Sequence, residues 1–342
     1  MYKKIILYIG PLVEGSITTQ RIDSMTKLGL KVIPLDIKNL YEQLDNPIKR
    51  RMTLKYNIGR SIVKINQFIL EKSINYQFDM VWINKGIVVQ PNTVKKLREM
   101  SKENIVIHYT ADPSLITHKT RLFIKSIPQY THCITTKSYE LEMYKKYNPQ
   151  KTLFVQQGYS EEFIKDREEK KNYKYDVVFI GRCEKHYVNI LKEILKVTNS
   201  IAIWGPWEKY IRKYPELKPY WKGKSVFGAE YIEKLCEGRI CLGLLCKIHP
   251  DVSTTRSFEI PATGSFLLAE RTDEHLDLFK EGVEAEFFGD NTELLSKVKY
   301  YLQNERCREE IAKNGQKRCI EDGYSNLERI RYIFENVLGE RL

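Results

Sequence analysis

The segment Ile248–Glu270 reads IHPDVSTTRSFEIPATGSFLLAE and contains a polar loop, a helix-like run and an apolar run in succession. Serine and threonine just ahead of a helix leave hydroxyls and unpaired backbone N–H groups at its positive end, which suits a phosphate. A Gly-Ser turn then leads into the apolar run, as expected where a helix returns to a buried strand. The segment therefore predicts a helix beginning near Thr255, within an α/β fold.

The charged and hydroxyl-bearing residues of this segment predict a site for a sugar diphosphate. Thr254 and Thr255 supply hydroxyls, and Arg256 adds a forked cation that fits phosphate oxygens. Glu259 falls one turn into the helix, where a carboxylate accepts hydrogen bonds from sugar or ribose hydroxyls. Asp251, separated from Glu259 by seven residues, is a second acid. The alternative for Glu259 is a solvated acid that the helix dipole favours.

Outside this segment, short apolar runs alternate with helix-like stretches along the whole chain. Near-continuous apolar strands between helices indicate parallel sheets covered on both faces, and the charged stretch between the two series indicates a linker. We therefore expect two doubly wound α/β units, 1–157 and 175–325, joined by 158–174. The first series of predicted strands is 4–10, 31–35, 79–84, 104–109, 132–136 and 152–156. The second is 175–181, 200–204, 224–228 (KSVFG), 239–245, 265–269 and 285–288.

The run RSFEIPATGSFLLAE resembles the R-[ST]-F-E-x-x-A-x-G-x-x-L-L motif of GT-B fold glycosyltransferases, close to their CgeB-like branch. Further similarity lies in FIGRCEKH (179–186), AIWGPW (202–207), ICLGLL (240–245) and the closing helices of 293–319, whereas the first half matches only through YTADPS (109–114). The resemblance implies two tandem Rossmann-like domains that face a central cleft. The C-terminal domain would hold the nucleotide sugar, and the helix of 326–342 would cross back onto the first domain. In the wider group the two acids are Glu-x7-Glu, so Asp251 departs from the pattern.

Residues that follow other predicted strands are further candidates, because ligands bind beyond the carboxyl ends of strands in doubly wound sheets. Gly181 and Arg182 follow the first strand of the second unit and would hold phosphate. The loop lacks G-x-G-x-x-G, so a tight turn with a solvated arginine is the alternative. Trp204 and Gly205 end the next strand, where the tryptophan lies either beside a nucleobase or in the core.

In the first half, Asp112 follows the fourth predicted strand as HYTADP. A carboxylate at that edge is a candidate general base toward an acceptor hydroxyl, with His108 as a weaker competitor. Asp112 is equally a turn residue ahead of Pro113.

Charge is distributed unevenly. Residues 1–157 carry 25 Lys and Arg against 12 Asp and Glu, whereas residues 158–342 carry 31 against 32. The segment 46–70 is basic and amphipathic, which indicates either an anionic membrane surface as a partner or a helix with a solvated basic face. No nucleic-acid-binding module is present, and no nucleic-acid partner is expected.

The seven cysteines include no C-x2-C pair, so we expect buried thiols rather than a metal site, and a reducing compartment. No apolar run is long enough to span a membrane. A cytoplasmic protein, peripheral on the inner face of the membrane if the basic segment binds lipid, fits these features.

These features together predict a glycosyltransferase that moves a sugar from a nucleotide diphosphate to an acceptor hydroxyl on a glycan, lipid or protein. No Asp-x-Asp pair suits a metal, so a metal-independent reaction without a cofactor is expected, with a cationic clamp on the diphosphate. The alternatives are a nucleotide-sugar epimerase or phosphorylase on the same plan, and a binding or scaffold protein without chemistry.

Overall fold

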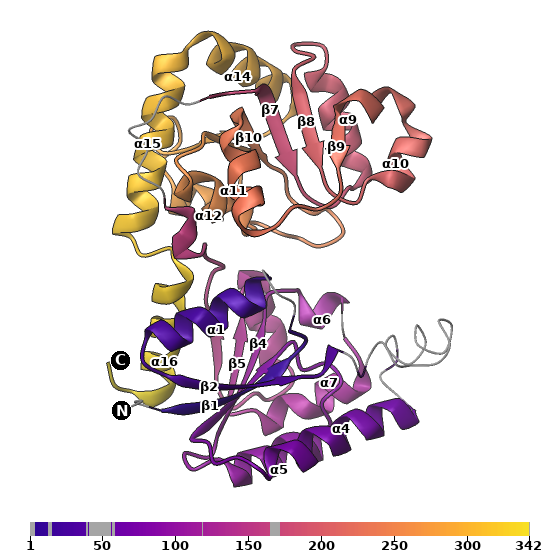
Figure 1. The fold of residues 1–342 in the computed structure, drawn as a ribbon, viewed down its shortest axis with the longest axis vertical. Coiled ribbons are helices and arrows are strands. Elements are labelled where there is room, and N and C mark those ends of the chain that lie inside the picture. The colour runs from indigo at the N-terminus through magenta and orange to yellow at the C-terminus, as the bar shows by residue number, and fades with distance from the viewer. Residues whose placement is uncertain are drawn as a thin grey trace. The chain divides into compact units, whose positions relative to one another are not determined.

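The computed structural model describes residues 4–12, 16–38, 40, 56, 59–117, 119–164 and 172–341. The chain divides into two compact units (Figure 1). Unit 1 comprises Met1–Gln157 and Asn326–Leu342, and unit 2 comprises Gly158–Ser325.

Unit 1 is built on a parallel six-stranded sheet in the order β2-β1-β3-β4-β5-β6. The order reverses direction between β1 and β3, so the topological switch point of this sheet lies at their carboxyl ends. The strands are β1 (Ile5–Gly10), β2 (Lys31–Asp36), β3 (Met80–Asn84), β4 (Ile105–Thr110), β5 (His132–Thr135) and β6 (Thr152–Phe154).

Helices cover both faces of this sheet, because successive strand side chains point to opposite sides and almost all of them are apolar. One face packs against α1 (Ile17–Lys27) and α16 (Asn326–Leu338), which lie side by side (Figure 1). The other face carries α4 (Arg60–Ser73), α5 (Pro91–Met100) and α7 (Arg121–Ser126). The smaller elements of unit 1 are α6 (Ser114–Thr117), η1 (Ile127–Gln129), η2 (Ser138–Glu140) and α8 (Leu141–Lys145).

Unit 2 has a second parallel six-stranded sheet in the order β12-β11-β10-β7-β8-β9. Counted within the unit, this is the Rossmann order, and its switch point lies between β7 and β10. The strands are β7 (Tyr175–Ile180), β8 (Ile201–Trp204), β9 (Trp221–Gly223), β10 (Gly238–Gly243), β11 (Leu267–Glu270) and β12 (Glu286–Phe288).

The two faces of the second sheet are again apolar and helix-covered. One face packs against α9 (Lys185–Ile194), α14 (Asn291–Gln303) and part of α15 (Glu305–Glu321). The opposite face packs against α11 (Gly228–Cys236) and α12 (Arg256–Ala262), so the predicted helix of the hydroxyl-rich segment starts where expected. The remaining elements are η3 (Glu161–Phe163), α10 (Glu208–Lys213), η4 (Pro215–Tyr220) and α13 (Asp273–Leu278).

Two sequence expectations differ from the structure. The strand predicted at 224–228 is wrong, because β9 ends at Gly223, whose φ of +150° turns the chain, and α11 begins at Gly228. The expected linker 158–174 is not free throughout. Tyr159 and Phe163 are buried in the core of unit 2, and residues 165–171 lie outside the described residues.

Of the basic segment 46–70, residues 46–55, 57 and 58 lie outside the described residues. Its described part includes the start of α4, which buries Ile62, Ile65 and Ile69 and leaves Arg60 and Lys64 exposed.

Candidate functional site

The loops that follow β7 and β8 are joined by close backbone contacts. The Gly181 N–H donates to the Trp204 carbonyl at 3.0 Å, and the indole N–H of Trp207 donates to the Gly181 carbonyl at 2.9 Å. Gly205 has a φ of +139°, and a Cβ there would lie 2.1 Å from the Gly181 carbonyl oxygen. Only glycine fits at 205, and the two loops form one rigid edge.

Arg256 lies at the switch point of this sheet, between the ends of β7 and β10. Its Nη2 donates to the carbonyl of Leu244 at 2.6 Å, and its guanidinium lies 5.5 Å from the centre of the Phe179 ring. Nη1 lies 3.1 Å from where a Cβ at Gly181 would be. Arg256 is half-buried and has no carboxylate partner among the residues that the structure describes. Because buried charges are normally paired, this cation is available to an anion.

The hydroxyl-rich loop ahead of Arg256 is held from both ends. The backbone N–H of Thr254 donates to the Ser257 hydroxyl at 3.1 Å, and Ser253 donates to the Glu274 carboxylate. The Thr254 hydroxyl is sealed from solvent without a partner in the described part of the chain. The Thr255 carbonyl accepts the N–H of Glu259 at 2.8 Å. Asp251 lies half-buried earlier in the same loop.

A buried pair of hydrogen-bonded side chains, Ser257 and His275, fixes the position of this loop. Ser257 Oγ lies 2.7 Å from His275 Nε2, and His275 Nδ1 lies 2.7 Å from the Glu270 carbonyl. Since a carbonyl only accepts, Nδ1 carries the proton, and Nε2 accepts the Ser257 hydroxyl proton. Burial lowers the pKa of His275 and keeps its ring neutral, stacked on Phe287. The chain of bonds leads from the Thr254 N–H to the end of β11.

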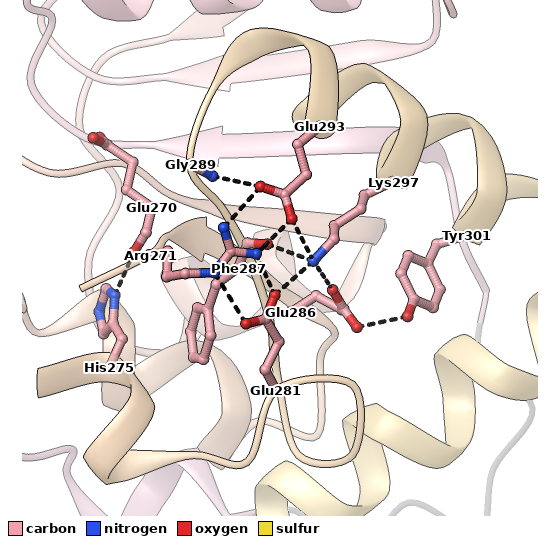
Figure 2. A network of polar contacts seen from close by, with 10 residues as sticks. All are labelled: Glu270, Arg271, His275, Glu281, Glu286, Phe287, Gly289, Glu293, Lys297 and Tyr301. Carbon is pink, nitrogen blue, oxygen red and sulfur yellow. Dashed lines mark hydrogen bonds and ion pairs between the residues drawn. The ribbon is translucent and has the colours of Figure 1, made fainter. Parts of the chain in front are cut away.

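The residue that follows β11 begins a charged network (Figure 2). Arg271 contacts Glu293 through Nη1 at 2.8 Å and Glu281 through Nε at 3.0 Å, and Lys297 bonds Glu281 at 2.7 Å. The Arg271 hydrogen bond lowers the pKa of Glu293 to about 2. Figure 2 also shows His275 bonded to the adjacent Glu270. The network thus ties α14 to the strand end that supports the loop.

Glu259 lies on the inner side of α12 and is 7% exposed. The Tyr231 hydroxyl of α11 donates to its Oε2 at 2.9 Å. Burial raises the pKa of Glu259 to about 7, although Tyr231, Arg256 and Thr255 each lower it. Burial and the neighbouring carboxylate raise the pKa of Tyr231 well above its usual range, so the phenol stays a donor. Glu259 therefore changes charge near neutral pH.

The remaining predicted residues of unit 2 lie in different settings. Gly181 and Gly205 are part of the rigid edge described above, and Arg182 is exposed and forms no ion pair with any residue that the structure describes. Trp204 is 5% exposed and packs edge-on against Tyr175, so its side chain belongs to the core rather than to an open binding surface.

In unit 1, Asp112 lies at the carboxyl end of β4. Its Oδ2 pairs with Lys85 Nζ at 2.8 Å, and its backbone N–H bonds the Thr110 hydroxyl at 3.2 Å. Both charged side chains are substantially exposed. His108 is fully buried, and burial lowers its pKa to about 4, so it is a core residue.

Sequence reasoning did not identify Tyr231 or the pair of Ser257 and His275. Tyr231 lies 28 residues from its partner Glu259, and Ser257 lies 18 residues from His275. No local pattern links such pairs. The signal available was the hydroxyl of Ser257 inside the RSFE motif.

The described residues include no group of three or more His, Cys, Asp or Glu side chains placed to hold a metal ion. The structure shows no disulfide among the seven cysteines, all of which lie in its described part. None of the helices in the described ranges is long and apolar enough to cross a membrane.

Residues 185–335 match the family model described as "Glycosyl transferase-like". The matched stretch contains α12, α13 and the network of Figure 2. No protein with a curated description matches the sequence.

Several solved structures resemble the whole chain. HepE from Anabaena, in a complex with UDP-glucose, is 12% identical with a TM-score of 0.67, over 98% of this chain and 100% of HepE. Sucrose-phosphate synthase from Thermosynechococcus elongatus is 9% identical with a TM-score of 0.68, over 98% and 100%. A UDP-N-acetylglucosamine 2-epimerase is 11% identical with a TM-score of 0.56, over 99% and 96%.

At these identities the likeness establishes the fold. The chain has the GT-B architecture of two tandem Rossmann-like α/β domains, as the sequence predicts. Residues 185–335 are in addition similar in sequence to the glycosyl transferase-like family model.

Proposed function

We propose that this protein is a glycosyltransferase that moves a sugar from a nucleotide diphosphate sugar to an acceptor hydroxyl. The observation that carries the proposal is Arg256, a half-buried guanidinium at the switch point of unit 2 with no carboxylate partner among the described residues. Ligands of doubly wound sheets bind at such points, and a guanidinium there fits phosphate oxygens.

The comparisons support the same reaction class. The family model covers α12 and its surroundings, and the HepE crystals contain UDP, UDP with glucose, or UDP-glucose. A nucleotide diphosphate sugar is therefore the proposed ligand of unit 2 here.

The proposed chemistry follows from where charge develops. As the bond between the sugar and the diphosphate breaks, the departing diphosphate gains negative charge. Arg256 and the unpartnered Thr254 hydroxyl would stabilise that charge, with Arg182 as an exposed second cation. Thr255 and Gly181 would contribute backbone close to the phosphates. α12 is only seven residues long, so we assign the main contribution to Arg256 rather than to a helix dipole.

Glu259 is proposed to accept hydrogen bonds from sugar or ribose hydroxyls. Tyr231 donates to one carboxylate oxygen, and the Thr255 side chain is a second hydrogen-bond partner of the carboxylate. Asp251 remains a proposed second acid of the donor site, and Gly205 is proposed to let the donor approach the backbone.

Asp112 is proposed as the general base toward the acceptor. Its exposed carboxylate can release the Lys85 side chain and bind an acceptor hydroxyl instead, because exposed ion pairs contribute little free energy. The metal-independent mechanism and hexosyl transfer also remain proposals.

We further propose that the acceptor is a cell-surface glycan, glycolipid or glycoprotein, and that the chain belongs to the CgeB-like branch through its RSFE motif. The basic excess of residues 1–157 supports a cytoplasmic protein that binds the anionic face of the membrane.

The test is a thermal-shift panel of UDP-, GDP-, dTDP-, CDP- and ADP-sugars on wild type, Arg256→Met and Arg212→Met. Arg212 is an exposed arginine of α10 whose side chain has no partner in the described part of the chain, which makes it the matched control. Ligand at about 100 times its dissociation constant adds about 2.7 kcal/mol of stability. We expect one nucleotide class to stabilise wild type and Arg212→Met, and to lose that effect in Arg256→Met.

Incubation of the identified donor then separates the remaining functions. Release of the nucleotide that depends on an acceptor supports a transferase. Conversion of the sugar without an acceptor identifies an epimerase, and cleavage by inorganic phosphate identifies a phosphorylase. Donor binding without any turnover identifies a binding protein.

A further inference from the structure

Lys85, the residue that follows β3, has a backbone conformation that is rare for a lysine. Its φ is +69°, in the left-handed region that favours glycine. Among the residues that the structure describes, the other non-glycine residues with a positive φ are Asn104 and Asn148, and asparagine tolerates this region well. A lysine here costs backbone free energy that a glycine would not. The chain therefore keeps a long cationic side chain at a position where it lowers stability.

Contacts with the neighbouring strand and its loops hold Lys85 in this conformation. Its N–H donates to the Tyr109 carbonyl at 2.7 Å, and its own carbonyl lies 3.3 Å from Nε2 of His108. Because a carbonyl only accepts, Nε2 carries the proton, and burial keeps the ring neutral by lowering the pKa of His108 to about 4. The next residue, Gly86, has a φ of +49°, and a Cβ there would lie 2.7 Å from the Tyr130 hydroxyl. The fold thus imposes the bend after β3.

The lysine side chain reaches the acid that follows the neighbouring strand. β3 and β4 are paired in parallel, so their carboxyl ends lie at the same edge of the sheet. Lys85 Nζ lies 2.8 Å from Asp112 Oδ2, and the two side chains are 36% and 53% exposed. Both charged groups can therefore contact a ligand. An exposed ion pair contributes little free energy, so it does not offset the backbone strain of Lys85. A role in binding accounts for the lysine where stability does not.

Buried polar side chains fix the loop that carries Asp112. The Thr110 hydroxyl donates to the Asp112 carbonyl at 2.8 Å and accepts the Ser114 hydroxyl proton at 3.0 Å. The buried Glu140 accepts the N–H of Leu115 through Oε1 at 2.7 Å. The main chain on both sides of the ion pair is thus held in place, and only the charged ends of the side chains are exposed. They lie at the edge where ligands of doubly wound sheets bind.

The chemistry of the pair fits two neighbouring hydroxyl groups. The Lys85 ammonium only donates hydrogen bonds, and an ionised Asp112 carboxylate only accepts them. One hydroxyl can therefore donate to Asp112 while the oxygen of its neighbour accepts from Lys85. The two charges are opposite, so the pair as a whole suits a neutral molecule. Sugars carry adjacent hydroxyls, whereas a serine, a threonine or a simple alcohol offers one.

We propose that Lys85 and Asp112 together bind two neighbouring hydroxyls of the acceptor, which is therefore a sugar. This inference rests on the proposed transferase function and on Asp112 as its base. The hydroxyl oxygen bonded to Asp112 forms the new bond to the anomeric carbon of the donor sugar, and its proton passes to the carboxylate. The bond from that carbon to the diphosphate breaks, and its electron pair leaves with the diphosphate. Lys85 holds the adjacent hydroxyl and orients the acceptor.

The experiment measures transfer from the nucleotide sugar that the thermal-shift panel identifies. The acceptor probes are the methyl glycosides of glucose, galactose, mannose and N-acetylglucosamine, a serine-containing peptide and ethanol. The variants are Lys85→Met, Lys85→Arg and Lys85→Gly. Lys145→Met is the matched control, because Lys145 of the same unit also forms an exposed ion pair, with Glu142. We expect at least one methyl glycoside, and neither the peptide nor ethanol, to increase nucleotide release by wild type and Lys145→Met.

Loss of the Lys85 ammonium should weaken acceptor binding selectively. With the best methyl glycoside we expect Lys85→Met to raise KM about tenfold and Lys85→Arg to restore most of the loss. Slow transfer to water needs no second hydroxyl and should keep its wild-type rate in all variants, whereas a purely structural role of Lys85 would change it. Lys85→Gly should have the same raised KM as Lys85→Met but unfold at a higher temperature, because glycine relieves the backbone strain.

Monodeoxy analogues of the best glycoside identify the hydroxyl that Lys85 holds. One of them should bind wild type about tenfold more weakly and show no further loss with Lys85→Met, because the same hydrogen bond is already absent. Equal KM values in wild type and Lys85→Met, or additive losses with every analogue, overturn the assignment of Lys85. If Lys85→Met does not fold, Lys85→Gly provides the same comparison.

The outcomes for the acceptor class are separate from those for the reaction. Transfer only to water, to the peptide or to ethanol overturns this inference alone. A wild-type protein that binds no nucleotide sugar, or binds one without any turnover, rejects the proposed function.

Discussion

Each of the two units places an arginine at the switch point of its own sheet, but the surroundings of the two arginines differ. Arg256 of unit 2 bonds the main-chain carbonyl of Leu244 and lies beside the glycine that ends the β7 loop. Arg21 of unit 1 lies over the ring of Tyr109 and bonds the amide of Asn84. Parallel topology fixes where a ligand can bind, because strand ends diverge there. The side chains around that point determine which chemical groups of a ligand can bind.

The two edges also differ in how their loops are held. In unit 2, hydrogen bonds connect successive loops through Gly181, Ser257 and His275, and a charged network supports them from β11 and α14 (Figure 2). In unit 1 the candidate base Asp112 is held by an exposed ion pair with Lys85. A site that must stabilise charge as it develops benefits from fixed groups, whereas an acceptor site has to admit different positions.

The largest effect is expected at Gly205. Gly205→Ala places a Cβ 2.1 Å from the Gly181 carbonyl oxygen and should destabilise the protein by about 3 kcal/mol or more. Gly29→Ala in unit 1 is the control, because Gly29 also has a positive φ, of +82°, but no atom within 4 Å of the added Cβ. It should cost about 1 kcal/mol. Urea unfolding measures the free energy of unfolding of both variants. Equal losses would show that the loops after β7 and β8 move to accommodate the added Cβ.

The second-largest difference is expected between the ion pairs of the two units, those of Glu293 in unit 2 and Asp112 in unit 1. Glu293→Gln should cost about 2 kcal/mol at neutral pH, a figure reduced for the partial exposure of the side chain. Because the folded pKa is lowered to about 2, this stability is present above the unfolded value and disappears as pH falls from about 4.5 toward 2. Asp112→Asn in unit 1 should cost no more than about 0.5 kcal/mol. Thermal unfolding between pH 3 and 7 checks this, and a stability difference between wild type and Glu293→Gln that does not shrink toward pH 3 would contradict it.

Donor binding should depend on pH through Glu259. Its folded pKa of about 7 means that the carboxylate which accepts ligand hydroxyls is mostly protonated at pH 6 and mostly ionised at pH 8. We expect the affinity for a nucleotide sugar to rise about tenfold over that range. Glu259→Gln should remove the dependence. Calorimetric titration measures the affinity at each pH. The same pH dependence in wild type and in Glu259→Gln would contradict the assignment of Glu259 to the ligand hydroxyls.

The same raised pKa has the opposite effect on folding. The folded state holds the Glu259 proton more tightly than the unfolded state does, so the protein without ligand should lose stability as pH rises from about 4.5 to 7.

The smallest effect is expected at Ser257. Ser257→Ala leaves the Thr254 N–H and His275 Nε2 without their partner and should cost about 1 kcal/mol. Ser73→Ala in unit 1 removes only a bond to the Ile69 carbonyl within α4 and should cost less than about 0.5 kcal/mol. Thermal unfolding distinguishes the two variants. An unchanged stability of Ser257→Ala would show that the hydrogen bonds from Thr254 through Ser257 to His275 do not hold the loop.

Sequence patterns identified the parts of the site that are local. The start of the helix at Arg256, the glycine after β7 and the alternation of strands and helices follow from short-range patterns of hydroxyl, glycine and apolar residues. Sequence patterns failed where the same residues are compatible with two different structural environments. Trp204 at a strand end is in the core, and KSVFG has strand composition but follows a glycine that had already turned the chain.

The amino-acid sequence by itself determined the α/β class, the parallel sheets and the helix that carries Arg256 and Glu259, because periodicity and turn residues act over a few positions. Tertiary structure alone decided that Arg21 lies over the ring of Tyr109, that Tyr231 bonds Glu259, and that His275 fixes Ser257. Those pairs are far apart in the chain. Only the packing of helices on the sheets brings them together, and only burial gives their charges and hydrogen bonds their strength.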